Sequence, residues 1–350
     1  MVKSADPIAS TLLDWYDEHA RDLPWRSPPG SPPPAPYRVW LSEVMLQQTT
    51  AAAVKPYFAQ FTERWPTVEA LAGATDEAVM AAWAGLGYYA RARNLLACAR
   101  EVAARGGAFP GTEAELRKLP GVGDYTAAAI AAIAFGQRAV VVDANVERVV
   151  SRLFAIAEPL PGARKAIRAA ADRITPDQRA GDFAQAMMDL GATICTAREP
   201  RCLLCPVSAH CEARALGEPA RYPVKGPKKA RPERRGTAFW IERDGAVWLV
   251  KREGRGMLGG MRALPDDAWR AGMDGAGEAA APLSGSWRPL GTVQHTFTHF
   301  RLELAVLAHD GPMAEPVGEG EWWPVDRLDD AGLPTLFAKA ARRAVTEREE

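Results

Sequence analysis

Four of the five cysteines of this chain lie in one short segment, CTAREPRCLLCPVSAHC (195–211). The N-terminal stretch MVKSADPIASTLLDWYDEHA carries acidic residues and lacks the apolar centre of a signal peptide, so we expect a cytoplasmic protein. Thiols stay reduced in that compartment. Four cysteines clustered in this way therefore indicate a metal site rather than disulfides.

The spacing of the cysteines narrows the kind of metal site. It reads Cys195-x6-Cys202-x2-Cys205-x5-Cys211, with a single C-x2-C pair and both flanking cysteines in the same short loop. Zinc sites more often use two separated pairs. A compact loop with four thiolates favours a cuboidal 4Fe–4S cluster, and zinc remains the alternative. Cys98 lies outside the segment, in a helical stretch, and is expected in the core.

A basic segment separates two kinds of sequence. RYPVKGPKKARPERRGTAFW (221–240) carries seven basic side chains and one acidic one, and its prolines and glycines are typical of a linker. In a chain of net charge zero it indicates a nearby polyanion, unless it serves solubility alone. Helical periodicity precedes it, as in 37–54 and 125–136, and β patterns follow it. The sequence contains no run of 18 apolar residues, so a membrane-spanning helix is not expected.

The pattern after the linker predicts a smaller α+β domain behind the all-α one. TAFWIER and AVWLVKR flank Asp244-Gly245, which is a hairpin signature. A further strand is expected at 300–308 and a terminal helix at 334–349. We therefore expect domains at 1–219 and 237–350, joined by a basic linker at 220–236.

The stretch KLPGVGDYTAAAIAAIAFG (118–136) predicts two helices joined by a tight turn. Gly121 and Gly123 allow backbone N–H groups to approach an anion at the positive end of the second helix. Such a helix-hairpin-helix holds a DNA phosphate without reading base sequence. The alternative is an ordinary helical turn in which the glycines serve geometry.

An apolar run ends at Asp143 in AVVVDANVERVVSRLF (139–154), and a helix follows. Taken alone, an aspartate at this place is most simply a helix N-cap. Its position twenty residues after the hairpin's second glycine favours a functional role instead.

The L-P-G-V-G turn, the following aspartate and the cysteine spacing together resemble the helix-hairpin-helix DNA glycosylases of the endonuclease III superfamily, over residues 8 to about 215. WLSEVMLQQT (40–49), GLGYYARARN (85–94) and QAMMDLGATIC (185–195) are similar to the adenine DNA glycosylase (MutY) branch. The resemblance implies removal of adenine mispaired with 8-oxoguanine, and a 4Fe–4S cluster on Cys195, Cys202, Cys205 and Cys211. It also implies a six-helix barrel part at about 30–136 and an iron–sulfur part at 1–29 plus 137–219.

One position separates two reaction types within the superfamily. Bifunctional members carry a lysine two residues after the second hairpin glycine, where its amine forms a Schiff base with the sugar. Tyr125 stands there in this chain, and no lysine lies between Lys118 and Lys165. We therefore expect a monofunctional glycosylase that uses water.

Two carboxylates fit the chemistry of that reaction. Adenine leaves more readily when protonated, and the sugar develops oxocarbenium character, so an acid and a carboxylate are both needed. Glu43 lies between Leu41 and Val44 on an apolar helix, where desolvation raises the pKa of a carboxyl group. The resemblance makes Glu43 the acid and Asp143 the group that stabilises the cation.

The resemblance also assigns residues to base recognition. Gln48 and Tyr88 match intercalating positions beside the flipped base, since the target adenine must leave the stack. Adenine itself would meet Arg26 and Gln185. Tyr125 and Asn145 would line the sugar side.

The C-terminal part resembles the Nudix-like domain of the MutY family. REGRGMLGGMRALPDD (252–267) is similar to its glycine-rich segment, although Arg262 and Ala263 replace the usual Trp and Glu. HTFTHFRL (295–302) is similar to the loop that contacts 8-oxoguanine, which implies roles for Thr298 and His299. The glutamate-rich metal box of a Nudix hydrolase is missing, so pyrophosphatase activity is not expected. Ala144, where the family has glycine, and Glu147 are further departures.

The expected partner is double-stranded DNA with A:8-oxoguanine or A:G mispairs. We expect the protein to act as a monomer and not to bind a membrane. Two alternatives stay open at this point. One is a bifunctional endonuclease III-like glycosylase and lyase, which Tyr125 disfavours. The other is a non-catalytic DNA-binding module, which would not need both Glu43 and Asp143.

Overall fold

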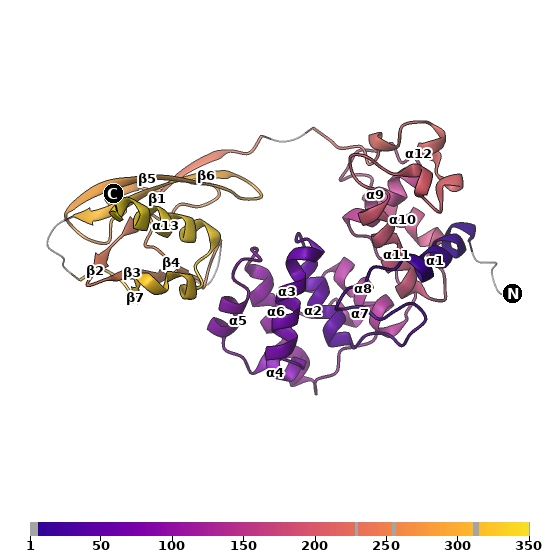
Figure 1. The fold of residues 1–350 in the computed structure, drawn as a ribbon, viewed down its shortest axis with the longest axis horizontal. Helices are drawn as coiled ribbons and strands as arrows, with labels where there is room; N and C mark the ends of the chain where they lie inside the picture. The colour runs from indigo at the N-terminus through magenta and orange to yellow at the C-terminus, as the bar shows by residue number, and fades with distance from the viewer. Residues whose placement is uncertain (1–5, 228–229, 254–256, 311–314, 350) are drawn as a thin grey trace. The chain divides into compact units, whose positions relative to one another are not determined.

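The computed structural model describes residues 6–227, 230–253, 257–310 and 315–349. The chain forms two compact units. Unit 1 comprises Met1–Ala74 and Asn94–Lys228, and unit 2 comprises Thr75–Arg93 and Lys229–Glu350. The helical first part and the mixed second part confirm the predicted fold class (Figure 1). The expected boundaries at 219 and 237 remain predictions, and residues 228 and 229 of the expected linker lie outside the described residues.

Unit 1 is helical. Its helices are α1 (Pro7–His19), α2 (Pro36–Leu46), α3 (Ala51–Arg64), α4 (Val68–Ala72), α7 (Glu113–Leu116), α8 (Asp124–Phe135), α9 (Ala144–Leu153), α10 (Arg164–Ile174), α11 (Ala180–Thr193) and α12 (Glu212–Ala215). Helix α6 (Ala90–Ala104) begins in the segment that belongs to unit 2 and continues into unit 1.

Local sequence signals explain where several of these helices begin. The Asp6 carboxylate accepts a hydrogen bond from the Ile8 N–H and Pro7 is the first residue of α1, as the sequence predicts. Eight of the twelve residues of α8 are alanine or isoleucine, and the helix is buried along most of its length. Small side chains allow α2 and α11 to pack closely against it. Helix α8 thus forms the centre of unit 1.

Unit 2 contains α5 (Asp76–Ala82) and two sheets. In the first, β1 (Glu233–Trp240) pairs in parallel with β6 (Arg301–Asp310), which pairs antiparallel with β5 (Ser286–Thr296). In the second, β3 (Ala246–Lys251) pairs with β2 (Glu242–Arg243), β4 (Arg262–Ala263) and β7 (Glu321–Pro324). Helix α13 (Thr335–Glu349) packs against the first sheet and completes its core (Figure 1).

The hairpin predicted at Asp244-Gly245 is present, but it is short. Both residues have positive φ, 51° and 73°, as a two-residue hairpin turn requires. The strand is interrupted at Ile241, so only the two residues of β2 pair with β3 in the hairpin, while β1 pairs with β6 in the other sheet. The predicted strand TAFWIER therefore supplies two sheets. No helix in the part of the chain that the structure describes is long and apolar enough to span a bilayer.

Candidate active site

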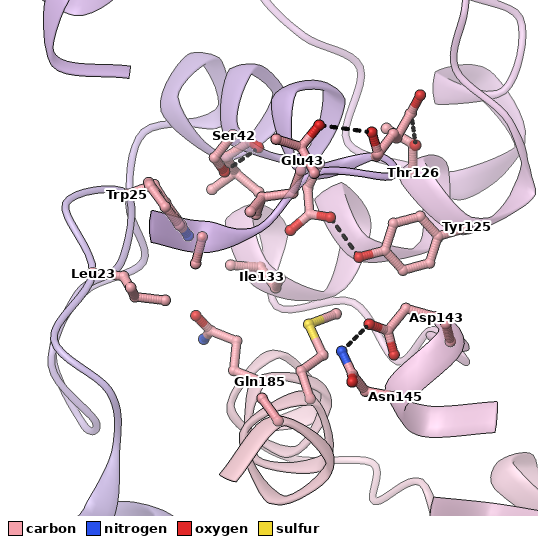
Figure 2. Close-up of a pocket in the computed structure, with 18 of the residues that line it drawn as sticks. Leu23, Trp25, Ser42, Glu43, Tyr125, Thr126, Ile133, Asp143, Asn145 and Gln185 are labelled. Carbon is pink, nitrogen blue, oxygen red and sulfur yellow. Dashed lines mark hydrogen bonds between the residues drawn. The ribbon is translucent and has the colours of Figure 1, made fainter. Parts of the chain in front are cut away.

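A cleft of about 1090 Å³ in unit 1 brings together residues that are far apart in the sequence (Figure 2). Its walls come from α2, α8, α11, the start of α9, the hairpin turn and the segment after α1. Nine of the residues predicted from the sequence line it: Arg26, Glu43, Gln48, Gly121, Gly123, Tyr125, Asp143, Asn145 and Gln185. Both predicted carboxylates, Glu43 and Asp143, therefore line the same cleft.

Glu43 is a buried carboxyl group on α2, with 4% of the residue exposed. The Tyr125 hydroxyl donates a hydrogen bond of 2.6 Å to Glu43 Oε2. Burial raises the pKa of Glu43 to about 7, and the negative charge of Asp143 adds to the rise. The hydrogen bond from Tyr125 and the positive charge of Arg26 act in the opposite direction. A carboxyl group in this state can deliver a proton near neutral pH.

Tyr125 follows the hairpin at the start of α8. Burial raises the pKa of its hydroxyl well above the usual value, and the charges of Glu43 and Asp143 raise it as well. The hydroxyl therefore stays protonated and remains a donor to Glu43. Tyr125 therefore holds the Glu43 carboxyl group by a hydrogen bond, and its protonated hydroxyl is not a nucleophile at neutral pH.

Asp143 is both the helix cap and a cleft residue. Its Oδ1 accepts a hydrogen bond from the Val146 N–H at 2.7 Å, which caps α9. Its Oδ2 accepts from Asn145 Nδ2 at 2.8 Å (Figure 2). The two interpretations of Asp143 that the sequence leaves open are therefore compatible, because the cap fixes the carboxylate at the positive end of α9.

Asn145 is in turn held by Arg148, a residue that sequence analysis missed. Arg148 Nη2 donates to Asn145 Oδ1 at 2.9 Å and to the Gly191 carbonyl at 2.7 Å, while Nε donates to the Cys195 carbonyl at 2.7 Å. A side chain at Gly191 would place its Cβ 2.6 Å from Asn145 Cβ, so glycine is needed there. Hydrogen bonds thus run without a break from Asp143 to the first cysteine.

Arg26 and Gln185 also line the cleft. Arg26 comes from the segment after α1, and its Nη1 donates to the fully buried Asp189 Oδ2 at 2.7 Å. Gln185 is buried on α11, one turn before Asp189. Gln48 follows α2 with φ of 57°, an uncommon backbone conformation for a side chain other than glycine.

The hairpin turn requires glycine at Gly121 as the sequence predicts, whereas Gly123 has φ of −87°, a conformation that other residues adopt as well. Gly121 has φ of +72°, and a Cβ there would lie 2.6 Å from Asn94 Cβ. Gly123 caps α8 without a side-chain hydrogen bond. The first N–H groups of α8 are accordingly available to an anion.

The four clustered cysteines follow α11 in a loop with two short 3-10 helices, Cys202–Leu204 and Ser208–His210. Buried Arg152 supports this loop: it donates to the carbonyls of Cys195, Thr196 and Ala197 and to Cys195 Sγ, the last at 3.2 Å. Burial, with added effects of Cys195, Cys211 and Cys202, raises the pKa of Cys205 to about 12. The thiols are thus close enough to affect one another.

Within the described ranges, no group of three or more His, Cys, Asp or Glu residues is placed to hold one metal ion. A mononuclear zinc site needs its ligand atoms within about 2.3 Å of a single point. In a cuboidal cluster each thiolate binds a different iron, so the sulfur atoms stand further apart. Among the described residues, the cysteine sulfur atoms are not gathered around one such point.

Three predicted residues lie in unit 2. Tyr88 has φ of 49° and is 49% exposed, with the Arg91 guanidinium 5.6 Å from its ring centre. Thr298 and His299 are exposed in the turn between β5 and β6, which the Phe297 N–H closes on the Phe300 carbonyl at 2.9 Å. Of the glycine-rich segment 252–267, residues 254–256 lie outside the described residues.

Comparison with known proteins gives two family matches. Residues 41–176 match the HhH-GPD superfamily of base excision DNA repair proteins, and residues 237–343 match the NUDIX domain. The human adenine DNA glycosylase is 36% identical over 97% of this chain and 74% of its own length. The adenine DNA glycosylase of Mycolicibacterium smegmatis is 44% identical over 60% of this chain and 70% of its own length. Among solved structures, a thermostable thymine-DNA glycosylase matches with a TM-score of 0.54 and 32% identity, over 60% of this chain and 95% of that one.

Proposed function

The chain belongs to the adenine DNA glycosylases of the HhH-GPD superfamily, which are base-excision repair enzymes that act on adenine, and we propose that it removes adenine mispaired with 8-oxoguanine or guanine in duplex DNA. The observation that carries this proposal is the pair of carboxylates in one cleft, in two different environments. Glu43 is buried with a raised pKa, and Asp143 faces two hydrogen-bond donors. Such a pair can divide acid and charge-stabilising roles.

Glu43 is the general acid of the proposed reaction. With a pKa of about 7, a substantial fraction of this carboxyl group is protonated at neutral pH. It delivers that proton to the flipped adenine, which becomes a better leaving group, and as the resulting carboxylate it can activate water. The Tyr125 hydroxyl stays bonded to Glu43 and orients it during the transfer.

Asp143 stabilises the sugar as positive charge develops on it. The carboxylate is fixed by the Val146 N–H and by Asn145, so it need not reorganise when the glycosidic bond breaks. Whether it stays a counter-ion or bonds transiently to the sugar, one carboxylate acts as acid and the other carries negative charge.

We propose that the reaction ends at the abasic site, without strand cleavage. A lyase of this superfamily needs an amine beside the sugar to form a Schiff base. Tyr125 stands in the place where bifunctional members carry lysine, and the described lining of the cleft includes no lysine. The nucleophile is accordingly water.

The contacts with the DNA follow from where each residue lies in the cleft and from the family resemblance. Arg26 and Gln185 would contact adenine in the cleft, with Tyr125 and Asn145 on the sugar side. The N–H groups after Gly121 and Gly123 would bind a DNA phosphate. We propose further that Gln48 and Tyr88 fill the space left by the flipped base, and that Thr298 and His299 contact 8-oxoguanine on the opposite strand.

We also propose that Cys195, Cys202, Cys205 and Cys211 hold a 4Fe–4S cluster. Membership of the family and the Cys-x6-Cys-x2-Cys-x5-Cys spacing support the cluster over zinc. The cluster would fix the loop after α11, to which Arg148 and Arg152 donate, and it has no hydrolytic task. We expect the full chain to act on DNA as a monomer.

Single-turnover excision on duplexes with adenine opposite 8-oxoguanine, guanine or thymine tests the proposal. We expect adenine release opposite 8-oxoguanine and guanine but not thymine, and strand breaks only after alkali. Strand breaks without alkali would mean a lyase, and tight binding without release would mean a DNA-binding module.

An Asp143→Asn variant isolates the chemistry. It keeps the size of the side chain and the cap of α9, since the amide oxygen still accepts from Val146. We expect binding to mismatched DNA within a few-fold of the wild type and loss of excision. Turnover near the wild-type rate would refute the role of Asp143.

A further inference from the structure

We propose that Asp189 is a positioning residue of the adenine site, because it fixes Arg21 and Arg26 in the wall of the cleft. The inference rests on the proposed adenine glycosylase function and extends it to a residue that sequence analysis passed over. Asp189 does not touch the cleft itself. Its contacts with the two arginines carry its effect there.

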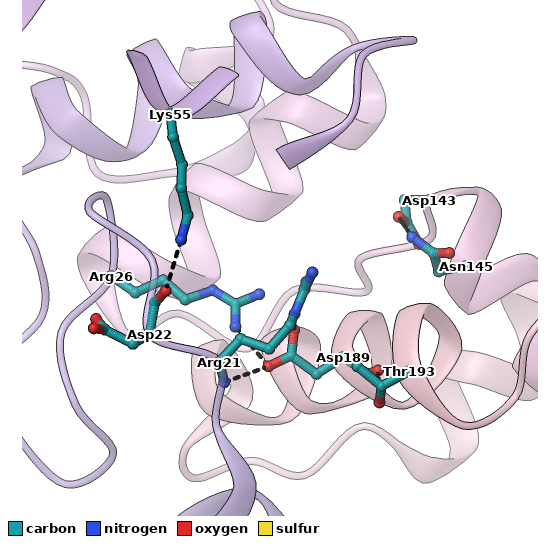
Figure 3. Close-up of polar contacts among 8 residues, drawn as sticks. All are labelled: Arg21, Asp22, Arg26, Lys55, Asp143, Asn145, Asp189 and Thr193. Atoms are coloured by element: carbon teal, nitrogen blue, oxygen red, sulfur yellow. Dashed lines mark hydrogen bonds and ion pairs between the residues drawn. The ribbon is translucent and has the colours of Figure 1, made fainter. Parts of the chain in front are cut away.

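Asp189 accepts three hydrogen bonds from the segment that follows α1 (Figure 3). Its Oδ1 accepts from Arg21 Nε at 2.6 Å. Its Oδ2 accepts from the Arg21 backbone N–H at 3.0 Å and from Arg26 Nη1 at 2.7 Å. One carboxylate thus fixes the backbone at Arg21 and the directions of two guanidinium groups, both of which line the cleft.

Burial restricts the movement of the Asp189 and Arg26 side chains. The Asp189 side chain is 0% exposed and the Arg26 side chain 7% exposed, so neither can exchange its partner for water. Charge-assisted hydrogen bonds of this kind are short and directional, and an unpaired carboxylate at this depth would be costly. The arginines are therefore held in place before DNA binds, which is the condition for binding a flipped base in one orientation.

The position of Asp189 on α11 connects it to the base site. Gln185 and Asp189 are four residues apart and share one face of the helix. Gln185 lines the cleft directly, and Asp189 lies one turn further along under the arginines. Because Arg26 uses one of its five N–H donors on Asp189, other donors remain for the base.

Asp189 also balances charge near the acid. Glu43 is influenced by Tyr125, Asp143 and Arg26, and the positive charge of Arg26 lowers its pKa. On its own side, Asp189 faces Arg21, Arg26 and buried Tyr16. Removing the negative charge of Asp189 would leave that of Arg26 unopposed, so Glu43 would lose its proton at lower pH.

The test is a double-mutant cycle between Asp189 and Arg26 in the full-length, cluster-containing chain. Single-turnover adenine excision opposite 8-oxoguanine is measured for Asp189→Asn, Arg26→Gln and the double variant, with thermal unfolding to verify that each folds. We expect Asp189→Asn to lower excision roughly tenfold to a hundredfold in the wild-type background and less than about twofold when Arg26 is already glutamine. The alkaline limb of its pH–rate profile should fall by about half to one pH unit.

The matched control is Asp17→Asn. Asp17 also pairs with an arginine across α1 and α11, since Arg179 Nη1 donates to it at 3.0 Å, but this pair lies on the surface outside the cleft. We expect wild-type excision from this variant. If Asp189→Asn does not fold, Asp189→Glu replaces it in the cycle, because the longer side chain keeps the charge but displaces the arginines.

Two results would overturn the inference. One is wild-type excision by a folded Asp189 variant. The other is an equal loss with and without Arg26, which would show that Asp189 does not act through Arg26. If the wild-type chain itself releases no adenine, the proposed function fails, and that outcome is distinct from either result.

Discussion

Replacing Glu43 by glutamine should stabilise the protein at alkaline pH while it abolishes excision. Burial raises the pKa of Glu43 from an ordinary 4.5 to about 7. The native state therefore holds the proton more tightly than the unfolded chain, and the associated stability is fully present below pH 4.5 and is lost as the pH rises through 7. Since one pKa unit corresponds to about 1.4 kcal/mol, the full loss is about 3 kcal/mol.

Glutamine is neutral at every pH, so the variant escapes this loss. Its amide oxygen can still accept the hydrogen bond from Tyr125. Relative to the wild type, the free energy of unfolding of Glu43→Gln should therefore grow by about 2 to 3 kcal/mol between pH 5 and pH 8.5. Excision should fall by at least about a hundredfold, because no proton reaches the base.

Urea unfolding of the full-length chain at both pH values measures the difference. Glu101→Gln is the matched control, because Glu101 pairs with Arg105 on the exposed surface of α6. Its effect should stay within about 0.5 kcal/mol at both pH values. A Glu43→Gln variant whose stability relative to the wild type does not change with pH, or declines at pH 8.5, would refute the desolvated-acid argument.

Three further predictions follow from the same site. Tyr125→Phe removes the hydrogen bond that lowers the pKa of Glu43, so the alkaline limb of the pH–rate profile should move up by about one unit or more; an unmoved limb would contradict the contact. Arg148→Met releases Asn145, and single-turnover excision should fall about tenfold or more while gel-shift affinity for mismatched DNA stays within a few-fold; equal losses in both would point to general misfolding. Iron and sulfide analysis of the purified chain should find about four of each, and Cys202→Ser should reduce both, whereas stoichiometric zinc would overturn the cluster.

Several features of the molecule could be predicted because they depend on neighbouring residues. The N-cap of α1 by Asp6, the hairpin glycines and the Asp244-Gly245 turn are set within a few residues of sequence. The raised pKa of Glu43 belongs to the same class, because an apolar helix face predicts burial of whatever it carries. Family resemblance added the other residues of the cleft, such as Asp143 and Tyr125, but the hydrogen bond from Tyr125 to Glu43 came from the structure.

Other features depended on contacts between distant segments. The strand expected over TAFWIER is interrupted at Ile241, and its first part, β1, pairs with β6 some seventy residues later in the chain. Hydrophobic alternation alone cannot specify that pairing. Nothing in the local sequence distinguishes Arg148 on α9, yet it donates hydrogen bonds to Asn145, Gly191 and Cys195.

The sequence by itself thus determined the fold class, the place of Glu43 on an apolar helix, and the cysteine loop, since periodicity, turn chemistry and cysteine spacing are properties of the local sequence. Only the tertiary structure decided how the cleft residues are held. Asp189 is one aspartate among many in the sequence, and its importance depends on 163 residues of chain returning to place Arg26 on its carboxylate. Charge pairing in a buried site is a property of the packed helices and has no signature in local sequence.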